Sequence, residues 1–134
     1  VIANGDIAST GDALTALRTS GAYGVMIGRA AMGRPWLLGE VTAALQGKPY
    51  VRPDRQTQLD SLIEQIEDTL SLYGASLGAR IVRKHVAACI DHLDTGWTVS
   101  DRRTYRSAMC QIVDPKLLIS GLQRLYLDEE CLAA

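Results

Sequence analysis

Hydrophobic positions change their spacing part-way along the chain. Residues 1–47 alternate short apolar runs with glycine-containing turns, whereas beyond about residue 53 the apolar positions recur every three to four residues. The first pattern is typical of buried strands alternating with helices, and the second is typical of amphipathic helices. The segment GKPYVRPD at 47–54 contains two prolines and has no helical period. We therefore expect two domains, residues 1–47 and 48–134, with the boundary in this segment.

The first region predicts the order strand, helix, strand, helix. Strand-like apolar residues at 1–3 and 23–28 precede helical patterns at 10–21 and 36–47, and Pro35 suits the first turn of the second helix. This order within fifty residues is typical of an α/β fold with parallel strands. A parallel pair needs neighbouring strands and cover on both faces. We therefore interpret the region as the end of a larger α/β domain, and expect its strands to pair with another copy of the chain or to be disordered.

The second region predicts a small helical bundle with a core of its own. An apolar stripe runs along 59–73, and Gly74 is a plausible end for that helix. A second helix is expected at about 77–93. Ser100 can cap a third, and a fourth is expected at 115–129, after an Asp-Pro pair that suits a helix start.

Two glycine turns are candidates for phosphate binding. Asn4, Gly5 and Asp6 follow the first expected strand, and Gly28 and Arg29 follow the second. Glycine allows backbone N–H groups to approach phosphate oxygens, and an arginine adds a charge-assisted hydrogen bond. In a (β/α)8 barrel the loops after strands seven and eight commonly hold a phosphate. The spacing alone also fits ordinary turns between strand and helix, so that alternative stays open.

Charge is segregated along a chain whose formal net charge is only −1. The expected helix at 59–73 carries acids and no cation, whereas six cations and three acids lie in 80–106. At 100° per residue these cations share one sector on each of two helices. They are Arg80, Arg83 and Lys84 on one helix, and Arg102, Arg103 and Arg106 on the next. Such a surface suits contact with a phosphate backbone. A solvated face with local ion pairs is the alternative.

Other side chains with possible chemistry have simpler interpretations. His85 lies at the edge of an apolar face, which favours a structural role over a catalytic one. Trp97 is expected to anchor packing, with stacking on a base as the alternative. Cys89, Cys110 and Cys131 show no metal-ligand spacing with each other or with histidine, so we expect reduced, buried thiols and no metal site. The reduced thiols favour a cytoplasmic protein, and no apolar run reaches membrane length, so we expect no membrane contact.

Three stretches together resemble a known family. VIANGDI, GVMIGRAAMGRPW and ARIVRKH are similar, in order and spacing, to the C-terminal part of bacterial tRNA-dihydrouridine synthases of the B-type, nitrogen-regulation-like group. The resemblance implies an α/β remnant, the last two βα units of a TIM barrel, followed by an all-α helical bundle domain. It implies that NADPH reduces FMN and that the flavin then reduces the C5–C6 bond of a tRNA uridine. It also implies that Asn4, Gly5, Asp6, Gly28 and Arg29 hold the FMN phosphate, largely through backbone amides.

The resemblance also implies how tRNA is bound and what this chain lacks. Arg80, Arg83, Lys84 and His85 match the family's basic helix motif, in the domain that grips tRNA. The family's catalytic cysteine, a general acid, lies in earlier barrel strands, so we expect no catalytic residue here and an inactive chain. A stand-alone helical RNA-binding module without flavin chemistry is the main alternative. Another phosphate-handling barrel enzyme is a further one, although the helical tail argues against it.

Overall fold

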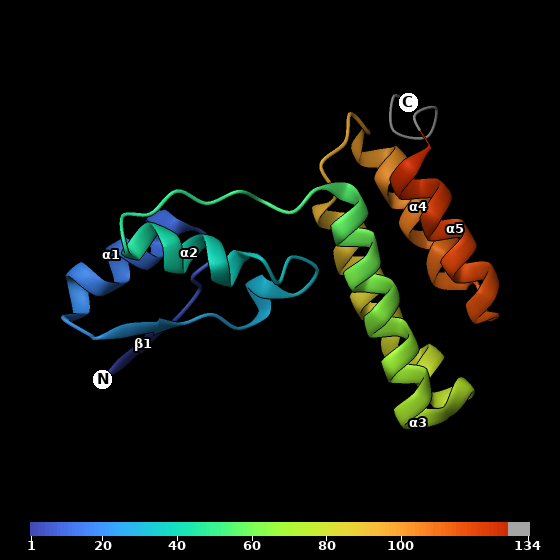
Figure 1. Ribbon diagram of the computed structural model, residues 1–134, viewed down its shortest axis with the longest axis horizontal. Coiled ribbons are helices and arrows are strands. Elements are labelled where there is room, and N and C mark those ends of the chain that lie inside the picture. The colour runs from blue at the N-terminus through green and yellow to red at the C-terminus, as the bar shows by residue number, and fades with distance from the viewer. Residues whose placement is uncertain (129–134) are drawn as a thin grey trace. The chain divides into compact units, whose positions relative to one another are not determined.

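The chain forms two compact units. The computed structural model describes residues 1–128. The division falls between the units Val1–Arg52 and Pro53–Ala134, within the proline-containing segment where the sequence places a boundary (Figure 1). Each unit has its own buried apolar cluster.

The first unit has the predicted order of elements. They are β1 (Ile2–Asn4), α1 (Thr10–Ser20), β2 (Gly24–Met26), the short 3-10 helix η1 (Arg29–Ala31) and α2 (Leu37–Leu45). The two strands pair in parallel, with Ala3 opposite Val25. They are therefore ordered by pairing with each other, and the expectation of disorder is wrong. Pro35 lies one residue before the N-cap of α2, in the turn that leads into the helix rather than in its first turn.

Only one face of this small sheet is covered. Ile7, Ala13, Leu37 and Val41 form a buried cluster, against which Val25 of β2 packs. The side chains of Ile2 and Met26 are 60% and 56% exposed. The sequence predicted strands buried on both faces, and within Val1–Arg52 no element covers the second face of the pair.

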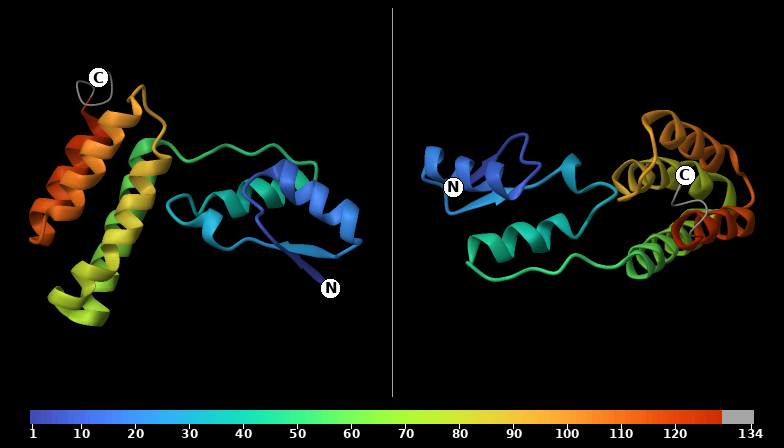
Figure 2. Two further views of the ribbon diagram at one scale, coloured as in Figure 1. Left: turned by 180° about the vertical axis from the view of Figure 1, so that it is seen from behind. Right: turned by 90° about the horizontal axis from the view of Figure 1, so that it is seen from above.

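The second unit consists of α3 (Arg55–His92), α4 (Val99–Gln111) and α5 (Pro115–Leu127). Helix α3 is two helical segments, because Gly74 has the non-helical angles φ 79° and ψ 166°. The chain reverses there, and the second segment returns beside the first (Figures 1 and 2). A Cβ atom at Gly78 would lie 3.0 Å from the Cα of Leu70, so the segments touch closely. The predicted helix stop at Gly74 is confirmed.

The buried core of the second unit is a single cluster from α3, α5 and the loop between α3 and α4, and the partly buried Tyr105 and Met109 of α4 pack against it. It includes Leu59, Ile66, Val86, Ile90, Leu122 and Tyr126. Trp97 is 8% exposed, and its ring lies 4.7 Å from that of Tyr105. The prediction that Trp97 anchors packing is confirmed, and the alternative of stacking on a base is wrong because the indole is buried.

Local hydrogen bonds set the starts of α4 and α5. The N-cap of α4 is Thr98, not Ser100: its hydroxyl accepts the N–H of Asp101 at 3.1 Å, and the Asp101 carboxylate accepts the N–H of Thr98 at 2.9 Å. This reciprocal pair provides acceptors for the backbone N–H groups of both Thr98 and Asp101, which the hydroxyl of Ser100 could not do alone. Asp114 caps α5 and Pro115 occupies its first turn, as predicted. The predicted end at 129 lies outside the described residues, and α5 ends at Leu127.

Candidate functional site: phosphate-type loops and a basic face

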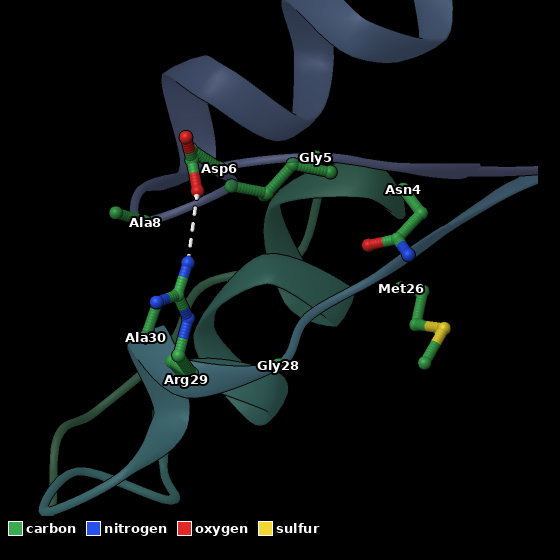
Figure 3. A pocket seen from close by; sticks show the side chains of 9 residues that line it. Asn4, Gly5, Asp6, Ala8, Met26, Gly28, Arg29 and Ala30 are labelled. Carbon is green, nitrogen blue, oxygen red and sulfur yellow. Dashed lines mark ion pairs between the residues drawn. The ribbon is translucent and has the colours of Figure 1, made fainter.

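The two glycine turns meet at one edge of the sheet. In the parallel register Asn4 is opposite Met26, so the loops after β1 and β2 leave the same edge. A hollow of about 410 Å³ lies between them (Figure 3). Its lining includes all five residues of the predicted phosphate site, together with Ile7, Ala8, Met26 and Ala30. The predicted residues are therefore brought together by the fold.

The backbone at both glycines is open. A Cβ atom at Gly5 or Gly28 would meet no other atom within 4 Å. The N–H of Ala31 donates to the carbonyl of Gly28 at 3.0 Å and so begins η1. The N–H groups at the start of such a helical turn have no acceptor inside it. An anion in this hollow could therefore be bound by backbone N–H groups, which is the chemistry that a phosphate requires.

Arg29 and Asp6 face each other across the hollow. The arginine Nη2 lies 3.8 Å from the aspartate Oδ1, and both side chains are almost fully exposed (Figure 3). An ion pair as exposed as this contributes little to stability. The guanidinium is therefore available to a ligand anion. The spacing of the two turns in the sequence gave no sign that Arg29 would pair with Asp6. To bind a ligand anion, the guanidinium must leave this carboxylate or contact both groups.

Arg34 joins the two loops. Its Nε donates to the carbonyl of Ala30 at 2.9 Å, and its Nη2 donates to the carbonyl of Ala8, also at 2.9 Å. One side chain thus connects the turn after β2 with the loop after β1. The sequence carried no signal for this role, because the two carbonyls become neighbours only in the fold.

A basic face lies on the second unit. Arg80, Arg83 and Lys84 are exposed on the second segment of α3, and Arg103 and Arg106 are exposed on α4. The Sγ of Cys110 on α4 donates to the carbonyl of Arg83 at 3.7 Å, which places the two helices together here. Arg106 forms an ion pair with Asp91 at 3.3 Å; within residues 1–128 the other four form none. We call these five residues the basic face.

Arg102 does not belong to this face. Its guanidinium donates to the carbonyls of Ile90 and Leu93 and to the hydroxyl of Thr95, and lies 5.4 Å from the centre of the Trp97 ring. From the sequence, Arg102 is expected among the RNA-contacting cations. In the structure its guanidinium contacts the loop between α3 and α4, and its RNA contact stays a prediction.

His85 is half-buried at the edge of the basic face. Burial lowers its pKa below the usual value, and the neighbouring charge of Lys84 lowers it further. The imidazole is therefore neutral at pH 7 and adds no charge to the face. Its predicted RNA contact, if made, would be a hydrogen bond or a packing contact.

The cysteines show no arrangement for chemistry. Cys89 is buried and Cys110 half-buried, and both are free thiols; Cys131 lies outside the described residues. Burial raises the pKa of Cys89 to about 11 and also raises the pKa of Cys110. Residues 1–128 contain no group of three or more His, Cys, Asp or Glu side chains placed to hold a metal ion. No helix in this described part is both long and apolar enough to cross a membrane.

The chain thus consists of two βα units with a hollow at one edge of their paired strands, followed by a helical bundle with a basic face. A sequence model of the dihydrouridine synthase (Dus) family matches residues 1–129. The chain belongs to this family, as the sequence motifs indicated.

Curated relatives agree with this family assignment. The chain is 37% identical over 132 residues to a probable tRNA-dihydrouridine synthase of Rhodobacter capsulatus, covering 97% of this chain and 38% of the relative. It is 42% identical over 130 residues to one of Rickettsia bellii, covering 94% and 37%. It is 42% identical over 102 residues to tRNA-dihydrouridine synthase B of Xanthomonas axonopodis pv. citri, covering 75% and 28%. The matched region therefore covers only 28–38% of the length of these relatives.

Proposed function

We propose that this chain is part of an FMN-dependent tRNA-dihydrouridine synthase, which reduces the C5–C6 double bond of a tRNA uridine with electrons from NADPH. Support comes from the family match and from the convergence of both glycine loops on one hollow. That convergence is the observation that carries the proposal, because two independent loops provide open backbone at the same place.

The residues present fit the phosphate end of FMN. Gly5 and Gly28 leave their backbone open, and Arg29 is exposed beside them. With Asn4 and Asp6 they would hold the phosphate, mainly through N–H groups, while Arg29 turns from the Asp6 carboxylate to the anion. When bound, FMN supplies the hydride that reduces the uridine.

The proposed role of this chain is binding and orientation, not proton transfer. Cys89 is buried in the helical unit, and the Cys110 thiol donates to a backbone carbonyl, so neither is proposed as the general acid. We propose that this chain alone has no catalytic activity. We also propose that the protein is located in the cytoplasm. The apolar side chains on the open face of the β1–β2 pair would pack against further barrel strands, or against a second copy where those strands are absent.

The basic face is proposed to contact tRNA phosphates. Five cations are exposed on it, and Arg80 and Arg83 form no ion pair within residues 1–128. Each phosphate contact releases counterions, so affinity should fall steeply as salt rises. Lys84 and His85 lie beside these arginines, and Arg102, Arg103 and Arg106 on α4 complete the predicted set.

Binding of an unmodified tRNA transcript at two salt concentrations tests the RNA part. The Arg80→Ala/Arg83→Ala double variant should bind more weakly, with a salt slope reduced by about 1.5. Arg18→Ala/Arg124→Ala removes two exposed arginines outside the face and serves as the matched control. Equal binding by wild type and the Arg80/Arg83 variant would exclude this face from RNA recognition.

Titration with FMN and with riboflavin, which lacks the phosphate, tests the cofactor part. Flavin binding by this chain alone should be weak and should favour FMN, and Gly5→Val/Gly28→Val should remove that preference because the added side chains cover the open backbone. No turnover of NADPH is expected. Binding of tRNA with no discrimination between FMN and riboflavin would favour a stand-alone helical RNA-binding module instead.

A further inference from the structure

A second hollow lies beside the basic face, within the helical unit. It has a volume of about 440 Å³ and is formed by the second segment of α3 and the connection between α4 and α5. Its lining consists of Ala75, Ser76, Ala79, Arg80, Arg83, Val113 and Pro115. We call it the α3 hollow. Its volume lies within the range of small-molecule sites.

Apolar walls and cationic groups meet in this hollow. Ala75 and Ala79 are small, and the side chain of Val113 is 70% exposed. Arg80 and Arg83 are exposed and form no ion pair within the described residues. An apolar wall alone would fit many partners, but two such guanidinium groups beside it select a ligand with both an apolar surface and an anionic group.

The surroundings do not neutralise this charge. No carboxylate lines the hollow in the described part of the chain. The nearest acid in sequence, Asp114, uses its carboxylate to accept the N–H of Lys116 at 2.8 Å. That carboxylate offsets the positive end of the α5 dipole at Pro115, so the two guanidinium groups carry the positive charge of the hollow. The potential in the hollow therefore favours an anion.

We propose that the α3 hollow receives one unpaired nucleotide of the bound tRNA. Its base packs against Ala75, Ala79 and Val113, while Arg80 and Arg83 bind the adjoining phosphates. This inference rests on the proposed tRNA binding by the basic face. Unpaired bases can leave the stack and enter such a site, whereas bases in an A-form duplex cannot. The helical unit therefore distinguishes a looped RNA from a continuous duplex.

Filling the hollow without changing its charge tests the proposal. Ala75 is exposed, so Ala75→Leu leaves the core intact. It should weaken binding of an unmodified tRNA transcript about fivefold, with an unchanged salt slope, because apolar contact is lost while phosphate contacts remain. Ala108→Leu, at an exposed position on α4 outside the hollow, is the matched control and should bind as wild type.

A second pair of variants removes contact rather than adding bulk. Val113→Ala should weaken binding of the transcript, whereas Val99→Ala, which removes the same atoms at a site 79% exposed on α4, should not. Circular dichroism melting of all four variants confirms that each is folded. A perfect RNA duplex serves as a second probe, and its binding should be unchanged in Ala75→Leu and Val113→Ala.

The outcomes separate this inference from the proposed function. If Ala75→Leu and Val113→Ala bind the transcript as wild type while Arg80→Ala/Arg83→Ala binds weakly, the basic face stands and the nucleotide site is overturned. An equal loss of affinity for duplex and transcript also overturns it, because a duplex offers no unpaired base. If Arg80→Ala/Arg83→Ala binds as wild type, both proposals fail together.

Discussion

The guanidinium of Arg102 donates a hydrogen bond to the backbone carbonyl of Leu93 at 2.9 Å, and so joins the start of α4 to the end of α3. Carbonyls at a helix C-terminus lack partners inside the helix, and a positive charge there also complements the helix dipole. Arg102 meets both requirements. The run of cations in the sequence therefore contains one residue that stabilises the bundle among others that face solvent.

Replacing Arg102 should affect stability, whereas replacing its neighbour should affect RNA binding. Arg102→Ala should lower the free energy of unfolding by about 2 kcal/mol, because it leaves several carbonyls without their charged donor. Arg103→Ala, on the exposed side, should change it by less than about 0.5 kcal/mol and should weaken binding of tRNA. Urea denaturation and filter binding measure the two effects. Equal stability of both variants would show that the contacts of Arg102 contribute nothing.

The cap of α4 can be tested with two adjacent hydroxyl residues. Thr98→Ala should lower the free energy of unfolding by about 1 kcal/mol, because the N–H of Asp101 loses its acceptor. Ser100→Ala should change it by less than about 0.5 kcal/mol, since that hydroxyl is inside the first turn. Thermal and urea denaturation of both variants provide the comparison. A larger loss of unfolding free energy in Ser100→Ala than in Thr98→Ala would indicate that Ser100 is the cap, as predicted from the sequence.

The reversal at Gly74 depends on backbone conformation rather than on space. Its angles, φ 79° and ψ 166°, lie in a region that is essentially restricted to glycine, and a Cβ atom added there would meet no atom within 4 Å. Gly74→Ala should therefore lower the free energy of unfolding by about 1–3 kcal/mol. Ser71→Ala, at an exposed helical position nearby, should be neutral in the same urea titration. Unchanged stability of Gly74→Ala would mean that α3 can reverse by another route.

Alkaline pH should destabilise the helical unit through Cys89. Burial raises the pKa of this thiol from its usual 9.0 to about 11, so above pH 9 the folded chain keeps a proton that the unfolded chain has lost. Below pH 9 the protonated thiol makes its full contribution to the free energy of unfolding. Above pH 9 this contribution falls by about 1.4 kcal/mol per pH unit as the pH rises towards 11. Cys89→Ala should lower this slope, measured by urea denaturation across that pH range. Tyr126 also has a raised pKa, caused first by burial and then by its contact with Cys89, so the difference between wild type and variant reports on this pair of groups together.

Much of the candidate site could be predicted because its elements are local. An apolar run followed by Asn4-Gly5-Asp6, and another followed by Gly28-Arg29, predict strand ends with open turns. Parallel pairing then requires both turns to lie at one edge of the sheet. The positioning role of Arg34 could not be predicted in this way, because its two acceptors are 26 and 4 residues away in sequence.

By itself, the sequence indicated the family through three stretches that resemble it. It also determined the order and type of the elements, the division near residues 47–54 and the helix end at Gly74. These depend on glycine, proline and apolar spacing within a few residues of each other, so short-range physics suffices. Only the tertiary structure decided the long-range partners: Arg102 with Leu93, Arg34 with Ala8, and the α3 hollow between segments far apart in sequence. The reason is that a helical wheel predicts the direction of a side chain but not which residues of another segment lie next to it.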